Sequence, residues 1–304
     1  PTVLVRAEIE RDVRRPSKRQ YERVIGLLDL LGCDVDRLVV GHRRAEHDDV
    51  RLSCGVDRGR MHVTGALDDD VRDYVPEVPD YGAKITLRHM MTHTSGLRDW
   101  GSVAQISGWG REERSHDHSD VIDIVSRQSA LNFEPGHEYS YSNTGYNLLA
   151  IIVGRVSGIS FADFSMKRIF EPLGMEHTQW RDDYRRIVKG RSTAYTALPD
   201  RTFEINRPIE YVHGNGGILT TVGDLLTWNQ ALTTGRLGGR EFVALMHETG
   251  HLNDGSEIVY AAGLRIAENS GVPAISHTGS TAGYRAVTTR YPDQKLRKNI
   301  QRFE

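Results

Sequence analysis

A tyrosine and an asparagine two residues apart, Tyr141 and Asn143, lie in the segment 135–149 (PGHEYSYSNTGYNLL) and could take part in acyl transfer. Acyl transfer by a serine needs an activated hydroxyl, a proton acceptor within hydrogen-bond reach and donors for the oxyanion. A tyrosine can accept that proton near neutral pH only if neighbouring cations lower its pKa from about 10. The simpler alternative is an aromatic-rich helix start with Asn143 as its cap.

A second polar segment, residues 277–284 (HTGSTAGY), contains His277, Gly279 and Ser280. Alone, His-Thr-Gly is a weak signal, because small and polar residues are common in turns. The segment lies directly before a predicted strand, and this context favours a functional role over a simple turn.

Other patterns argue against metal and nucleotide chemistry. His89 and His93 have metal-ligand spacing, but no glutamate follows His89, so the metalloprotease signature fails and a structural role is expected. Residues 116–118 (HDH) are expected in a solvated loop. The glycine run 214–217 (GNGG) lacks the lysine of a phosphate loop. Ser95 lies in a helix-terminating turn and not in a Gly-x-Ser-x-Gly elbow. The sequence therefore predicts no metal and no cofactor.

The elements that would position these residues become regular from Leu67 onward, after a turn-rich segment over 67–82 that we expect at the surface. Capping by Thr86, by Ser160 and by Thr221 or Gly223, together with apolar spacing, predicts helices. They are expected over 87–94, 120–128, 143–156, 161–172, 221–232 and 240–247. β-Branched and aromatic runs between turns predict strands over 257–267, 274–278 and 284–291.

The first 66 residues have a different character, since Tyr21 is the only aromatic residue among them. A strand over 1–5 and an amphipathic helix over 19–31 are predicted there, but residues 41–66 show no periodicity. The sequence thus divides into an atypical N-terminal segment (1–66), a regular domain (67–295) and a short, polar, atypical tail (296–304).

In order and context, the segments 85–97 (ITLRHMMTHTSGL), 135–149 and 277–284 resemble three landmarks of the serine β-lactamase-like hydrolases. These hydrolases include class C β-lactamases, D-alanyl-D-alanine carboxypeptidases and related esterases. The resemblance covers residues 67–295 and implies an α/β (α+β) fold, in which an antiparallel sheet is flanked by helices with a helical insertion. In this chain that fold would be incomplete at both ends.

The resemblance also implies roles for individual residues. Tyr141 would be the general base, Asn143 would position the substrate amide, and His277 would be a cation or hydrogen-bond donor near the substrate. Gly279 and Ser280 would form the oxyanion strand. A small-molecule, peptide or ester substrate would be cleaved through an acyl-enzyme without a cofactor.

The family's nucleophile lies in a Ser-x-x-Lys box, but no serine of this sequence has a lysine three residues later. Family spacing places the box near residues 45–50. We therefore expect little or no activity from this chain, and hypothesise that residues 41–66 are translated out of frame. Two alternatives stay open. The chain is a non-catalytic member that binds a peptidoglycan-like or small ligand, or another serine such as Ser53 has replaced the nucleophile.

Composition excludes several other classes of protein. A hydrophobic share of 38% and a charged share of 26% are typical of a globular chain with a sizeable core. The formal net charge of −2 gives no reason to expect a nucleic-acid partner. No apolar run reaches membrane-spanning length, and no signal peptide is predicted. Compartment, oligomeric state and the choice among β-lactam, D-amino-acid peptide and ester substrates stay open.

Overall fold

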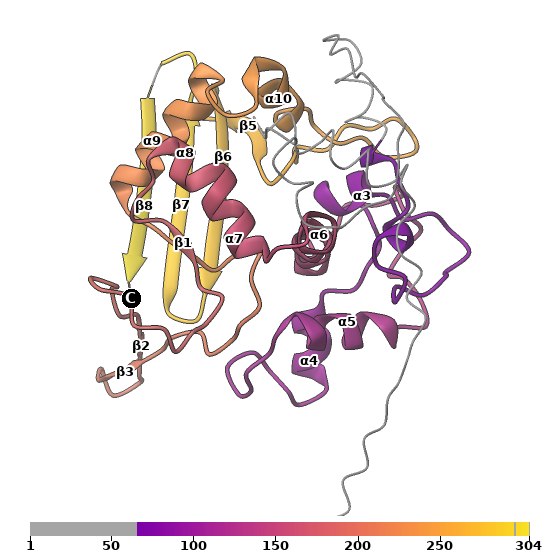
Figure 1. Ribbon diagram of the computed structural model, residues 1–304, viewed down its shortest axis with the longest axis horizontal. Coiled ribbons are helices and arrows are strands. Elements are labelled where there is room, and N and C mark those ends of the chain that lie inside the picture. The colour runs from indigo at the N-terminus through magenta and orange to yellow at the C-terminus, as the bar shows by residue number, and fades with distance from the viewer. Residues whose placement is uncertain (1–65, 295, 304) are drawn as a thin grey trace, which may run out of the picture.

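The computed structural model describes residues 66–294 and 296–303, in which short helices precede an antiparallel sheet (Figure 1). The helical elements are the 3-10 turn η2 (Val71–Asp73), α3 (Leu87–Met91), α4 (Trp100–Ile106), α5 (His118–Ser126), α6 (Asn143–Ser157), α7 (Phe161–Ser165), the π-helical turn η3 (Met166–Phe170), α8 (Glu171–Leu173), α9 (Val222–Thr234) and α10 (Gly239–Met246). The strands are β1 (Gln179–Trp180), β2 (Tyr195–Ala197), β3 (Phe203–Ile205), β4 (Ile218–Leu219), β5 (Arg265–Asn269), β6 (Val272–Thr281), β7 (Tyr284–Tyr291) and β8 (Leu296–Phe303).

Helix α6 lies at the centre of the first core, where it contacts α3, α4, α5 and α7. Trp100, Met90 and Leu148 are completely buried there. The expectation that residues 67–82 lie at the surface is wrong, because their apolar side chains join this core. The buried members of the segment include Val71, Tyr74, Val75 and Val78. The exposed acidic residues between them make the segment look like surface in sequence.

A second core forms where α7, η3 and α8 pack beside α9. Its buried residues are Phe170, Leu173, Met175, Trp180, Ala231 and Leu237. Ser160 caps the first of these helices, as predicted, with its Oγ accepting from the backbone N–H of Asp163 at 3.0 Å. Thr221 caps α9 in the same way, and α9 lies against β8. Capping residues therefore predict the first residue of these helices more accurately than the last residue.

The main sheet is antiparallel, with the strand order β5-β6-β7-β8. The bounds predicted for β7 are confirmed, and β6 extends the prediction at both ends. The predicted strand over 257–267 is wrong over most of its length. Residues 261–264 form a turn in which the N–H of Ala261 donates to the carbonyl of Leu264 at 2.8 Å, so β5 begins only at Arg265.

The tail from residue 296 contributes β8, which the sequence analysis does not predict. It pairs with β7 from Tyr291↔Leu296 to Tyr284↔Phe303. A polar segment can form a strand when a neighbouring strand supplies the hydrogen-bonding ladder, and that partner is not visible in local composition.

Several predictions concern residues outside the described ranges. These are the strand over 1–5, the helix over 19–31, the out-of-frame hypothesis for 41–66 and the alternative nucleophile Ser53. Within the described ranges, no single helix is long and apolar enough to cross a membrane. Only α6 together with the helical stretch 161–173 reaches that length, as a pair bent by 80°.

Candidate functional site

Asn143 is the first residue of α6, and neighbouring loops hold its polar groups. Its backbone N–H and its side-chain Nδ2 both donate to Oδ2 of Asp99, at 2.7 and 2.8 Å. Its Oδ1 accepts a hydrogen bond from Nδ2 of Asn215 at 3.1 Å. Asp99 also caps α4, since its Oδ1 accepts from the backbone N–H of Ser102 at 3.0 Å. The side-chain amide of Asn143 is therefore oriented from both ends.

The network continues into the core through Asn147, which lies one turn further along α6. Nδ2 of Asn147 donates to Oδ1 of Asn215 at 2.9 Å and to the carbonyl of His213 at 3.0 Å. Its Oδ1 accepts from Nε1 of Trp100 at 2.9 Å. Buried polar groups that are satisfied in this way fix a single arrangement of the surrounding segments.

The glycine run 214–217 forms the turn that brings Asn215 to α6. Gly214 has a φ of +107°, and a Cβ built on it would lie 2.5 Å from Cβ of Ala150. Both the backbone conformation and the close approach require glycine at this position. The run therefore lies beside Asn143.

Tyr141 lies in a cluster of rings and is 46% exposed. Its neighbours, with centroid distances of 4.1, 6.2 and 6.3 Å, are His93, Tyr260 and His277. Partial burial raises the pKa of Tyr141, and Tyr139 and Asp99 add to the shift. Among the described residues, no cation contributes to this shift. Tyr141 therefore stays protonated at neutral pH, which is the opposite of what a base requires.

His277 is a neutral hydrogen-bonding group in this arrangement. Its Nδ1 lies 2.7 Å from the carbonyl of Thr278, and its Nε2 lies 2.8 Å from the hydroxyl of Tyr260. Because a carbonyl can only accept, we assign the proton to Nδ1, so that Tyr260 donates to Nε2. Burial lowers the pKa of His277. The geometry therefore favours an uncharged ring over the cationic role that the resemblance offered.

Gly279 and Ser280 lie further along β6, opposite Ala286 and Arg285 of β7, and both are exposed. Among the described residues, a Cβ built on Gly279 would meet only Cβ of Ala286, at an ordinary 3.8 Å. Packing within this part of the chain therefore does not require glycine here. The missing side chain instead leaves the strand open to a molecule approaching from outside.

His93 has a location that its sequence spacing does not reveal. It has a left-handed φ of 58° and is 2% exposed. Its Nδ1 accepts from the backbone N–H of Ser142 at 3.3 Å, and its buried Nε2 has no partner among the described residues. Burial is the main cause that lowers the pKa of His93 to about 4. His89 has a separate role, because its Nδ1 accepts from the backbone N–H of Thr86 in the capping box of α3.

The expectation of a solvated loop at 116–118 is wrong. His116 is 1% exposed, and its Nε2 lies 2.8 Å from the carbonyl of Trp109. Asp117 caps α5, and Nε2 of His118 lies 2.8 Å from the carbonyl of His213. Across residues 66–294 and 296–303, no group of three or more histidine, cysteine, aspartate or glutamate side chains could hold a metal ion.

The structure thus brings Tyr141 and His277 together, with Asn143 two residues from Tyr141 and with Gly279 and Ser280 further along β6. Four further residues surround this group, and the sequence pattern does not predict any of them as a member of it. They are Asp99, Asn215, Tyr260 and His93. Asp99 caps α4. Because the sequence pattern does not predict a helix there, nothing in the sequence marked Asp99 as a capping residue.

A sequence model of the family described as Beta-lactamase matches residues 56–297. The match covers more than three quarters of the chain. It begins downstream of residues 45–50, where the resemblance places the Ser-x-x-Lys box.

Similar proteins include penicillin-binding protein 4* of Bacillus subtilis, which is 31% identical over 245 residues, or 75% of this chain and 53% of that protein. A D-aminopeptidase of Brucella anthropi is 26% identical over 81% of this chain and 46% of its own length. The chain therefore spans about half the length of the curated relatives it matches.

Solved structures share the fold. A D-stereospecific amidohydrolase from Streptomyces has a TM-score of 0.68 at 19% identity, and the match covers 95% of this chain and 81% of that one. An octameric penicillin-binding protein homologue from Pyrococcus abyssi has a TM-score of 0.68 at 21% identity, over 94% of this chain and 61% of that one. The family match and these likenesses agree with the fold described above, and the chain belongs to the Beta-lactamase family of serine hydrolases.

Proposed function

We propose that this domain has the frame for hydrolysing an amide or ester through an acyl-enzyme, and that this particular chain has little or no such activity. Tyr141 would be the base, Asn143 would position the substrate amide, and Gly279 and Ser280 would line the oxyanion side. The observation that carries the second half of the proposal is that no serine of the sequence has a lysine three residues later. Burial, Tyr139 and Asp99, which raise the pKa of Tyr141, support it.

A working site would need two groups that the described residues do not supply at Tyr141. One is a serine within hydrogen-bond reach of the Tyr141 hydroxyl, and the other is a cation that lowers its pKa. A Ser-x-x-Lys box would supply both the serine and the cation. The sequence has no such box. His277 does not replace it, because burial lowers its pKa and both ring nitrogens have partners.

The names of the relatives guide the choice of substrate class. A D-aminopeptidase and a D-amino acid amidase are among the similar proteins. This supports amides of D-amino acids as the first substrates to test, with a simple ester and a chromogenic β-lactam beside them.

The test is to treat the purified chain with a fluorophosphonate probe and to map any labelled residue by peptide mass spectrometry. We expect no serine to be labelled above the level found in the heat-denatured chain, and no substrate turnover above buffer. A single labelled serine, together with turnover, would show a working nucleophile and overturn the proposed loss of activity.

A second candidate is a family member that binds a peptidoglycan-like or small ligand without cleaving it. It is favoured by the rings of Tyr139 and Tyr141, which are 42% and 46% exposed and offer stacking surface without catalysis. Saturable binding of a D-amino acid amide without turnover, lost in the Y141A variant, would support this candidate. Turnover of the same amide would exclude it.

A further inference from the structure

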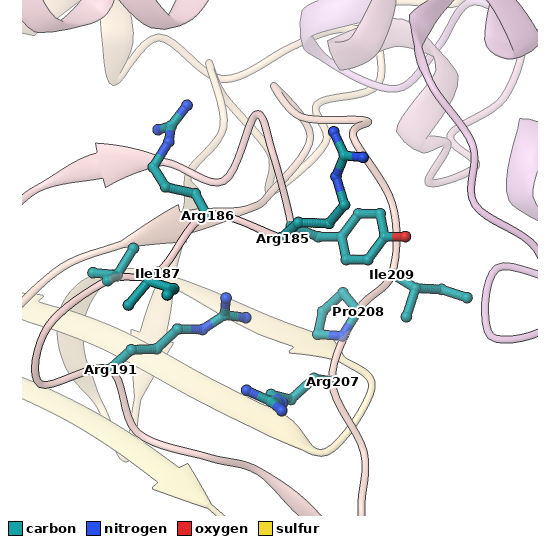
Figure 2. A pocket seen from close by; sticks show the side chains of 9 residues that line it. Arg185, Arg186, Ile187, Arg191, Arg207, Pro208 and Ile209 are labelled. Carbon is teal, nitrogen blue, oxygen red and sulfur yellow. The ribbon is translucent and has the colours of Figure 1, made fainter.

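A pocket of about 440 Å³ lies outside the group formed by Tyr141 and His277 and shares no residue with it (Figure 2). Its walls come from two separate segments, 184–191 and 207–209. Part of the lining is apolar, from Ile187, Val188, Pro208 and Ile209. The remainder is dominated by four arginines, namely Arg185, Arg186, Arg191 and Arg207. The volume is within the range of small-molecule sites in proteins.

Two of these arginines are occupied by nearby carboxylates. Nε of Arg185 lies 3.2 Å from Oδ1 of Asp183, and Nη2 of Arg186 lies 2.7 Å from Oδ1 of Asp182. The Arg185 guanidinium also lies over the ring of Tyr211, at 5.5 Å. The two carboxylates therefore balance the positive charges of Arg185 and Arg186 within the protein.

The other two arginines have no such partner. Over the described part of the chain, neither Arg191 nor Arg207 forms an ion pair with a carboxylate. Nε of Arg191 is buried without a hydrogen-bond partner, and its guanidinium lies 6.0 Å from the ring of Tyr284. In Figure 2 the guanidinium groups of Arg185 and Arg186 point away from those of Arg191 and Arg207. Two uncompensated positive charges therefore line one pocket.

The carboxylate of Glu210 is also occupied. Glu210, directly after the pocket segment, is 2% exposed, and its side chain pairs with Arg111 and Arg181 at 2.5 and 3.2 Å. These ion pairs hold the segment that contains Arg207 in place. The carboxylate of Glu210 is thus engaged by arginines outside the pocket lining.

We propose that this pocket binds a small organic carboxylate with an apolar body. A guanidinium presents N–H groups in a planar fork that matches a carboxylate, and a buried, unpartnered N–H is costly until an acceptor arrives. The apolar walls favour a hydrocarbon body over a bare inorganic ion, because they have no polar group to offer to the rest of a phosphate. The inference is independent of the proposed catalytic function.

The test is calorimetric titration of the purified chain with 3-phenylpropionate, and with its neutral amide as the matched ligand. We expect the carboxylate to bind at least about tenfold more tightly than the amide, and more weakly as salt is raised from 50 to 300 mM. R191Q and R207Q should each weaken binding by about tenfold. The control R201Q changes an exposed arginine on the β2–β3 turn and should leave the affinity within about twofold.

Several outcomes would overturn the proposal. Equal affinities for the carboxylate and the amide would show that the pocket does not recognise the negative charge. Equal affinities of R207Q and R201Q would place the ligand elsewhere. Tighter calorimetric binding of inorganic phosphate than of 3-phenylpropionate would assign the pocket to phosphate. Arg207 is exposed, so R207Q remains decisive if circular dichroism shows that R191Q does not fold.

Discussion

Oδ2 of Asp99 accepts hydrogen bonds from both the backbone N–H and the side-chain Nδ2 of Asn143, at 2.7 and 2.8 Å. One oxygen of the Asp99 carboxylate therefore accepts from the first backbone N–H of α6, and the other oxygen caps α4. A negative charge at a helix N-terminus is favourable, and here it also fixes the orientation of a candidate site residue. The orientation of Asn143 thus depends on a residue 44 positions earlier in the chain.

Replacing Asp99 should destabilise the domain and free the amide of Asn143. We expect D99A to lower the free energy of unfolding by about 1–3 kcal/mol, because two helix starts lose an acceptor. Urea denaturation measures this. D123A removes an exposed carboxylate of α5 that pairs with Arg127, the residue after the helix, and should change stability by less than about 0.5 kcal/mol. Equal effects of the two variants would contradict the proposed double role of Asp99.

His93 should make stability fall as the medium becomes acidic. Its pKa is about 4 in the folded chain and about 6.5 when unfolded, so the unfolded chain takes up the proton first as pH falls. The contribution of neutral His93 is complete above about pH 6.5 and is lost between pH 6.5 and 4, by at most about 3 kcal/mol.

The variant H93N tests this pH dependence, since asparagine tolerates the left-handed φ of 58°. The loss of stability between pH 7.5 and pH 5 should be smaller in H93N than in the parent chain. The variant H137N, at an exposed histidine, should keep the full loss. An unchanged loss in H93N would show that other histidines cause it.

Gly214 should not tolerate a side chain. G214A places a methyl group 2.5 Å from Cβ of Ala150 at a φ of +107°, so we expect a loss of about 2–4 kcal/mol from overlap and backbone strain together. G216A is the matched control, because no described residue lies within 4 Å of its Cβ position. Thermal unfolding compares the two. Similar melting temperatures would mean that the turn relaxes without cost.

Glu210 should be among the most sensitive charged positions. It is 2% exposed and pairs with Arg181, which is 3% exposed, and with Arg111. E210Q leaves buried positive charge without its counter-ion, which typically costs about 3–5 kcal/mol. E204Q, on the exposed strand β3, should have little effect. If denaturation midpoints of the two variants agree, the buried pairs contribute nothing to stability.

The out-of-frame hypothesis makes a prediction about the gene. Resequencing should find an insertion or deletion upstream of codon 66, and the corrected frame should encode a Ser-x-x-Lys box near residues 45–50. An intact frame from codon 1 to codon 66 would exclude the hypothesis. The chain would then be a natural member of the family without this box.

The sequence by itself determined the helix starts capped by Thr86, Ser160 and Thr221, the strand β7 and the family. These features are local or depend on the order of short motifs, so they can be read without knowing which segments meet. The raised pKa of Tyr141 could not be predicted in this way, because it arises from burial beside rings and charges from distant segments.

Only the tertiary structure decided the hydrogen bond between Tyr260 and His277, the burial of residues 71–78 and the pairing of the polar strand β8. The hydrogen bond and the burial depend on partners from other segments of the chain, and β8 depends on the ladder that β7 offers across a short turn. The same reason applies to Arg191 and Arg207, which look like ordinary surface arginines until two loops meet around one pocket. Local composition specifies which groups a chain has, and long-range packing decides their partners and their charge.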